Sequence, residues 1–221
     1  NLYDPATDTW TQGAAPGFSL HHFQAVAHEG LVYVLGAFTG NFPNEDPVPQ
    51  IYVYDPQGDQ WHKGPTIPAA RRRGSAAAVL HDGPFYILGG LTNGHQSGWV
   101  PWLDRFDPAT NTWTALPDAP HSRDHFHAVS QGQKLYAAAG RNTGKTSVFA
   151  DVIRAVDVYD FDQQSWTTLS DSLPKGRAGN AAALLGNELL IIGGESTQPN
   201  AHNETTALDL NQETWRSLSP L

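Results

Sequence analysis

A single spacing runs through the whole sequence and limits what the chain can fold into. Five tryptophans are separated by 51, 52, 53 and 49 residues, and an aspartate stands six residues before each of them. The pairs are Asp4 and Trp10, Asp55 and Trp61, Asp107 and Trp113, Asp160 and Trp166, and Asp209 and Trp215. Spacings of this size predict a repeat protein, in which each unit is one supersecondary element that packs against its neighbours.

Each repeat contains short apolar runs that predict strands. Four of them have the length and β-rich composition of a second strand, and they cover residues 31–36, 85–90, 135–140 and 189–194. The first strands, 74–80 and 179–185, consist largely of small side chains, which suit a crowded innermost strand around a common axis. No segment carries a helical period, so we predict an all-β chain of four-stranded antiparallel units.

Three features together resemble the kelch repeat over essentially the whole chain. They are the double glycine, as in Gly89-Gly90, the hairpin Tyr54-Asp55-Pro56, and the tryptophan six residues after the aspartate. Departures occur at Ala37 and Ala139, which interrupt the double glycine, and at Leu20, where the arginine of the repeat would fall. The resemblance implies one kelch-type β-propeller domain over 1–221, with a half blade at 1–15 and full blades at 16–66, 67–118, 119–171 and 172–221.

The repeats are most similar to those of bacterial, secreted kelch proteins with a galactose-oxidase-like central domain. That similarity implies an extracellular or cell-surface location, with a cytoplasmic one left open. Propellers of this kind have roughly six or seven blades, so we expect the four and a half blades to be a fragment of a larger ring.

Composition excludes several classes of function. Acidic residues number 22 and basic residues 13, for a net charge of −9, so the broad basic surface of a nucleic-acid binder is missing. The absence of cysteine removes disulfides and thiol chemistry, and with them the cysteine–tyrosine cross-link that the resemblance to galactose oxidase would require. No apolar run is long enough to span a membrane. We therefore predict no cofactor, no nucleic-acid partner and no membrane span.

Cationic residues gather where the first strands are expected to begin. In a four-stranded meander the first strand starts on the face where the second strand ends, so both sets of loops share one mouth of the channel. Five of the nine arginines and five of the ten histidines lie there. Such a cluster favours an anionic or hydroxyl-rich ligand, a glycan for example, or a protein partner. The predicted ligand-binding residues are Arg72, Arg73, Arg123, Arg177, His22 and His125, with Trp99 from a long loop on the same face.

Structural alternatives stay open for these residues. Arg123 and Arg177 stand where kelch repeats generally carry arginine, and could tie their loops to backbone carbonyls. The histidines could offer imidazole ligands to zinc or copper. Because the sequence supplies no complete ligand set, we assign no metal and expect channel water to satisfy them. The acidic loop 44–46 is predicted to be a solvated turn.

Three functions follow from this pattern. The first is a non-catalytic kelch propeller that binds a ligand or protein partner at the channel mouth, through the loops before strand one and between strands two and three. The second is a carbohydrate-active enzyme similar to the kelch-type sialic acid mutarotases, which use the same propeller. The third is a structural component of an extracellular assembly.

Overall fold

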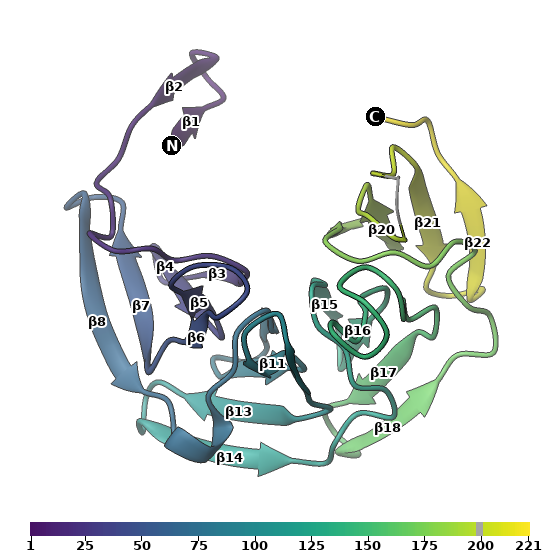
Figure 1. Cartoon of the computed structure of the whole chain (residues 1–221). Helices are drawn as coiled ribbons and strands as arrows, with labels where there is room; N and C mark the ends of the chain where they lie inside the picture. The colour runs from purple at the N-terminus through teal and green to yellow at the C-terminus, as the bar shows by residue number, and fades with distance from the viewer. Residues whose placement is uncertain (198–200) are drawn as a thin grey trace.

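The strands form an open arc of four-stranded sheets (Figure 1), in a computed structural model that describes residues 1–197 and 201–221. The four blades are β3 (Gln24–His28), β4 (Leu31–Leu35), β7 (Gln50–Asp55) and β8 (Gln60–Thr66); β9 (Ala77–Leu80), β10 (Phe85–Leu88), β13 (Leu103–Asp107) and β14 (Thr112–Leu116); β15 (Ala128–Gln131), β16 (Lys134–Ala137), β17 (Asp157–Asp160) and β18 (Ser165–Thr168); and β19 (Ala181–Leu185), β20 (Glu188–Ile192), β21 (Thr205–Asp209) and β22 (Thr214–Ser217). Each is an antiparallel meander, which confirms the prediction of an all-β propeller.

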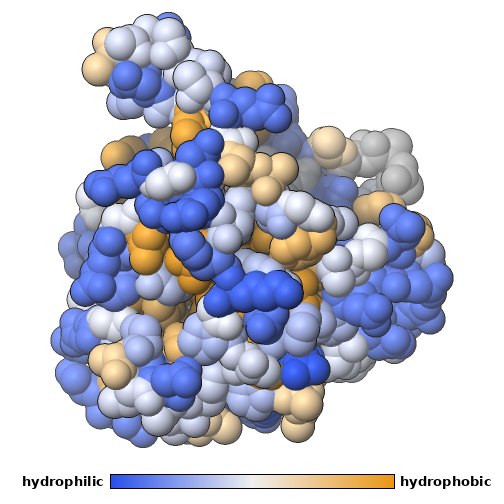
Figure 2. Space-filling view, turned by 90° about the vertical axis from the view of Figure 1, so that its left-hand side faces the viewer, coloured by the Kyte–Doolittle hydropathy of each residue, from blue (hydrophilic) through white to orange (hydrophobic). Residues whose placement is uncertain are grey.

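Three small hairpins and one short helix complete the described structure. The hairpins are β1 (Leu2–Asp4) with β2 (Thr9–Thr11), β5 (Phe38–Thr39) with β6 (Asp46–Pro47), and β11 (Leu91–Asn93) with β12 (Ser97–Trp99). The helix is the 3₁₀ turn η1 (Ala69–Arg71). The β1–β2 hairpin stands away from the body of the molecule (Figures 1 and 2). No helix among the described residues is long and apolar enough to cross a membrane.

The repeated aspartate builds the turn between the third and fourth strands. In all five copies its Oδ1 accepts a hydrogen bond from the N–H two residues later, at 2.8–3.0 Å. The residue four places after the aspartate is left-handed in every copy, with φ between 46° and 55°; these residues are Asp8, Asp59, Asn111, Gln164 and Glu213. The side-chain bond closes the turn locally, which explains why aspartate recurs at this position.

The repeated tryptophans join neighbouring blades. Trp113, Trp166 and Trp215 each pack into a hydrophobic cluster that their own blade shares with the preceding one. The indole N–H of Trp166 donates to Pro117 O at 2.8 Å, so it also bonds to the loop leading out of the preceding blade. Trp10 is 69% exposed. Among the described residues, the two strands of its hairpin pair only with each other, so no preceding blade covers the ring.

The first strands begin later than the sequence predicts. β9 starts at Ala77 rather than at Gly74, and β19 starts at Ala181 rather than at Gly179. The cause is a left-handed residue just before each strand, Ser75 with φ 56° and Gly179 with φ 63°, which interrupts the extended backbone. The interruption matters for function because it sets the direction of the side chains at the channel mouth.

Candidate functional site

The start of each first strand and the end of each second strand meet at one rim. In every blade one isolated antiparallel bridge joins the two segments, and the bridged residues are His21 and Phe38, Gly74 and Leu91, Asp124 and Arg141, and Ala178 and Glu195. Their backbone hydrogen bonds measure 2.7–3.0 Å. Loops that are far apart in sequence therefore form one continuous rim.

A chain of backbone hydrogen bonds runs around this rim from blade to blade. Ser75 N donates to His22 O at 2.8 Å, His125 N to Ser75 O at 3.3 Å, and Gly179 N to His125 O at 2.6 Å. All four residues are left-handed, with φ between 51° and 63°. Left-handed backbone is costly for residues other than glycine and concentrates at functional sites. The same position in each blade thus lines the channel, and two of the four residues there, His22 and His125, carry imidazoles.

Three of the predicted arginines point into the blades. Arg73, Arg123 and Arg177 are at most 2% exposed. Each donates to a backbone carbonyl of its own blade, and these contacts are Arg73 Nε to Gly89 O at 2.6 Å, Arg123 Nη1 to Ala139 O at 2.8 Å, and Arg177 Nη2 to Ile191 O at 3.0 Å. Burial lowers the pKa of all three guanidinium groups. Their placement favours the structural alternative, in which the arginine holds the loop to its blade.

Buried carboxylates neutralise two of these arginines. Asp104 accepts a bond from Arg73 Nη1 at 2.6 Å, and Asp157 accepts one from Arg123 Nη2 at 2.5 Å. Arg72 differs from them: it is half-buried, and its Nε donates to Ile67 O at 3.1 Å. The cationic field that the sequence suggests at the channel mouth is therefore largely cancelled inside the blades.

The two tryptophans of the long loop have different surroundings. Trp102 lies beneath a guanidinium, with Arg71 Cζ 4.2 Å from the ring centroid, so it serves the packing of its blade. Trp99 ends β12 and is half-buried, with Lys145 Nζ 5.8 Å from its ring centroid. Trp99 therefore lies between the loops of the second and third blades, and its role in binding stays a prediction.

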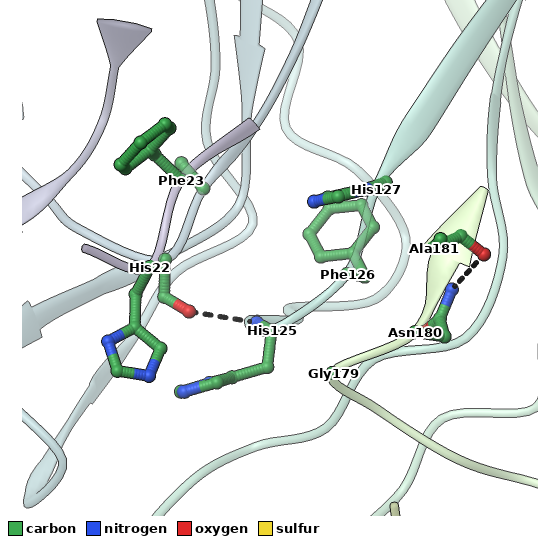
Figure 3. Close-up of a pocket in the computed structure, with 10 residues that line it drawn as sticks. His22, Phe23, His125, Phe126, His127, Gly179, Asn180 and Ala181 are labelled. Atoms are coloured by element: carbon green, nitrogen blue, oxygen red, sulfur yellow. Dashed lines mark hydrogen bonds between the residues drawn. The ribbon is translucent and has the colours of Figure 1, made fainter. Parts of the chain in front are cut away.

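Histidines from three different loops converge at the channel mouth. The ring centroids of His22, His95 and His125 are 4.7, 4.8 and 4.9 Å apart, and His95 Nε2 lies 2.9 Å from His125 Nε2. Figure 3 shows His22 and His125 side by side at the mouth, with His127 farther along the chain. Partial burial, followed by repulsion from His125 and His95, lowers the pKa of His22 to about 4. The three rings form an almost equilateral triangle, which we call the histidine triangle.

Carboxylates stand behind two of the three rings. Asp124 Oδ1 lies 2.5 Å from His125 Nδ1, and Glu45 Oε1 lies 2.7 Å from His95 Nδ1. The His95 Nδ1 and Glu45 Oε1 atoms are within ion-pair distance, but their geometry is not that of a well-aligned hydrogen bond. Both carboxylates are buried, so the prediction that 44–46 is a solvated turn is wrong for Glu45. The loop turns Glu45 inward, where His95 N also donates to its Oε2 at 3.2 Å.

Two cavities meet at the histidine triangle. One, of about 280 Å³, extends along the channel past Phe126, His127 and Asn180, and is lined by both His22 and His125 (Figure 3). The other, of about 430 Å³, opens at the mouth and is lined by His22 and His95. Its remaining lining residues include Phe42, Glu45, Arg141, Phe149 and Glu195. The mouth cavity combines aromatic rings with charged groups, the composition of a recognition pocket.

Known proteins share both the repeat and the fold of this chain. The family model described as the KLHDC2/KLHL20/DRC7 Kelch-repeats domain matches residues 22–220. Kelch-like protein terF of Aspergillus terreus is 31% identical over 228 residues, covering 96% of this chain and 47% of that protein. Kelch-like protein 23 of Mus musculus is 24% identical over 222 residues, covering 100% of this chain and 37% of that protein. The chain thus spans about half the length of such relatives or less.

A solved structure shows the same architecture. The structure of YjhT superposes with a TM-score of 0.79 at 18% sequence identity, covering 96% of this chain and 74% of that one. Identity at this level supports the fold and nothing finer. The sequence relatives named above come from a fungus and a mammal, so they lend no support to a bacterial, secreted origin. That origin stays a prediction.

Proposed function

This chain belongs to the kelch-repeat family of β-propellers, and we propose that it is an interaction module that binds a protein partner at the rim of its channel. Kelch-like relatives make a protein-interaction domain the expected role. The observation that carries the proposal is the mouth cavity of about 430 Å³, which draws its lining from the loops of all four blades. A recognition surface built from variable loops on a rigid scaffold is a common arrangement.

Two phenylalanines are the anchors that we propose for the partner. Phe42 is 64% exposed and Phe149 is half-buried, and both line the mouth cavity. Arg141 lines the same cavity: its Cζ is 5.1 Å from the Phe149 ring centroid, and its Nη1 contacts Glu195 Oε1 at 2.7 Å. Aromatic residues, phenylalanine included, and arginine are enriched in the buried core of protein–protein interfaces.

Removing both rings is expected to weaken partner binding without unfolding the protein. The double variant Phe42→Ala with Phe149→Ala should lose at least roughly tenfold in partner affinity, since interface aromatic rings commonly contribute more than about 1.4 kcal/mol. The measurement is affinity capture with the full-length protein, followed by titration of the captured partner. Trp10→Ala is the matched control, because Trp10 is equally exposed, at 69%, but lies on the terminal hairpin.

Retention of the same partners at wild-type affinity by the double variant would refute the rim as the binding surface. Circular dichroism must show the wild-type strand content for the comparison to count. A glycan array run with the same three proteins separates the partner classes. If the wild type binds a glycan and the double variant does not, the rim binds a hydroxyl-rich ligand rather than a protein partner.

A further inference from the structure

The histidine triangle has the composition of a transition-metal site. One ring nitrogen from each of His22, His95 and His125 lies within 4.8 Å of the other two. A tetrahedral ion with bonds of about 2.0–2.1 Å requires ligand nitrogens about 3.3 Å apart, so modest side-chain movements would seat an ion between the three rings. From this arrangement we propose that the rim binds a divalent transition-metal ion, such as Zn²⁺, through these three imidazoles.

The partners behind the rings support this assignment. Metal-bound histidines usually hold their second nitrogen against a carboxylate or another acceptor, which orients the ring and selects its tautomer. Here His125 Nδ1 contacts Asp124, His95 Nδ1 contacts Glu45, and His22 Nδ1 lies 2.6 Å from His21 Nδ1. In each ring the Nδ1 therefore lies within 3 Å of another polar group, and His95 Nε2 and His125 Nε2 lie 2.9 Å apart on the other side of their rings.

Buried charge gives an independent reason for a cation here. Asp124 is 0% exposed and Glu45 is 3% exposed. Asp124 accepts hydrogen bonds from Thr143 N and Oγ1, which carry no charge. Arg141, the buried bridge partner of Asp124, donates through Nη1 to Glu195 and through Nε to Thr143 Oγ1 at 2.9 Å. Buried carboxylates are costly unless a positive charge compensates them. A divalent ion held by the adjacent imidazoles would balance these two carboxylates.

The backbone holds the ligands in place before an ion arrives. His22 and His125 are fixed in left-handed conformations by the chain of hydrogen bonds around the rim. His95 lies at the tip of the β11–β12 hairpin, where its N–H donates to Pro43 O of the first blade at 3.1 Å. The site therefore joins three loops from three blades. Rigid placement of this kind is what a metal site requires of its scaffold.

The three imidazoles leave a coordination position that the mouth cavity can supply. His22 and His95 line that cavity, so water or a group from a bound ligand can reach the ion. Sites with three protein ligands and one exchangeable position differ in this respect from closed structural zinc sites. A second set, His21, His22 and Glu45, overlaps the first at His22. We favour the histidine triangle because Glu45 already supports His95 and because His21 Nε2 lies 3.1 Å from Gly40 O.

Metal uptake by the full-length protein tests the proposal without any partner. After chelator treatment, calorimetric titration with Zn²⁺ is expected to show one tight site per chain. Co²⁺ in its place should give the visible absorption of a four-coordinate nitrogen-rich site. A wild-type protein that takes up no stoichiometric Zn²⁺, and gives Co²⁺ the spectrum of the hydrated ion, would leave only an imidazole hydrogen-bond network and overturn the proposal.

Variants then assign the ligands. His95→Gln should weaken Zn²⁺ binding by roughly 100-fold or more, since changes to supporting residues alone cost about 10–100-fold. Asp124→Asn changes a supporting residue, so it should weaken Zn²⁺ binding by about 10–100-fold. His62→Gln, at an exposed histidine outside the cluster, should bind as the wild type does. Wild-type affinity in His95→Gln would also overturn the assignment. Because metal uptake is measured without a partner, its result tests the metal site independently of the proposed protein interaction.

Discussion

The Arg123→Ala variant is expected to unfold with a free energy about 3–5 kcal/mol below that of the wild type. Arg123 and Asp157 are both 0% exposed, and their contact of 2.5 Å joins the start of the third blade to β17. Removing the guanidinium leaves the buried Asp157 carboxylate with only Thr168 and the partly exposed His121 as side-chain partners. A buried carboxylate that loses its guanidinium costs far more than a surface pair does. The check is a chemical denaturation curve followed by fluorescence and circular dichroism.

Two further variants show whether the buried charge is the cause. Arg216 makes a 2.7 Å pair with Glu188 at the surface, so Arg216→Ala should change stability much less. The double variant Arg123→Met with Asp157→Leu should recover part of the loss, because no charge is then buried alone. If Arg123→Ala unfolds at the denaturant concentration of the wild type, the structural role assigned to this arginine is wrong.

The repeat made most of the fold predictable from sequence. Asp107 closes its turn through a bond to the backbone two residues away, and Trp113 packs against the preceding blade. The turn bond recurs in all five copies and the packing against a preceding blade recurs for Trp113, Trp166 and Trp215, so both leave a periodic signal. The common rim of loops could also be predicted from the repeat, because the path of a four-stranded meander fixes which loops lie on the same face.

The arginines show where pattern alone fell short. Arg73 and Ser75 are two residues apart, and in a regular strand their side chains would point to the same side. Ser75 is left-handed, however, so alternation fails between them: Arg73 turns into its blade, while the next positions face the channel. The sequence shows that these arginines precede the first strands, but it gives no signal for this change of direction.

The histidine triangle was only partly visible in the sequence. His22 and His125 stand at matching places in their blades, so the repeat marked both of them. His95 and Glu45 lie in loops without a repeated pattern, 50 residues apart, and they meet only because two hairpins of neighbouring blades contact each other. Contacts between variable loops depend on tertiary structure, so the third imidazole was missed and the carboxylate was expected to be solvated.

The double glycine of the repeat leads to the second large effect. Gly89 has φ 66°, and a Cβ added there would lie 2.3 Å from the carbonyl oxygen of Arg123 in the next blade. Neither backbone can yield easily, because Gly90 N donates to that same oxygen at 2.8 Å. Gly89→Ala should therefore lower the free energy of unfolding by about 2–5 kcal/mol, the sum of left-handed strain and overpacking.

Gly193→Ala separates the two contributions. Gly193 occupies the same position in the fourth blade with φ 61°, but among the described residues the nearest atom to an added Cβ is Leu221 Cδ1, the end of a side chain, at 3.4 Å. Ala139 already adopts φ 65° at this position in the third blade, so left-handed strain alone is tolerated there. Gly193→Ala should cost only about 1–2 kcal/mol in the same denaturation experiment. Equal losses in the two variants would show that strain, rather than the close approach of the next blade, accounts for the glycine at position 89.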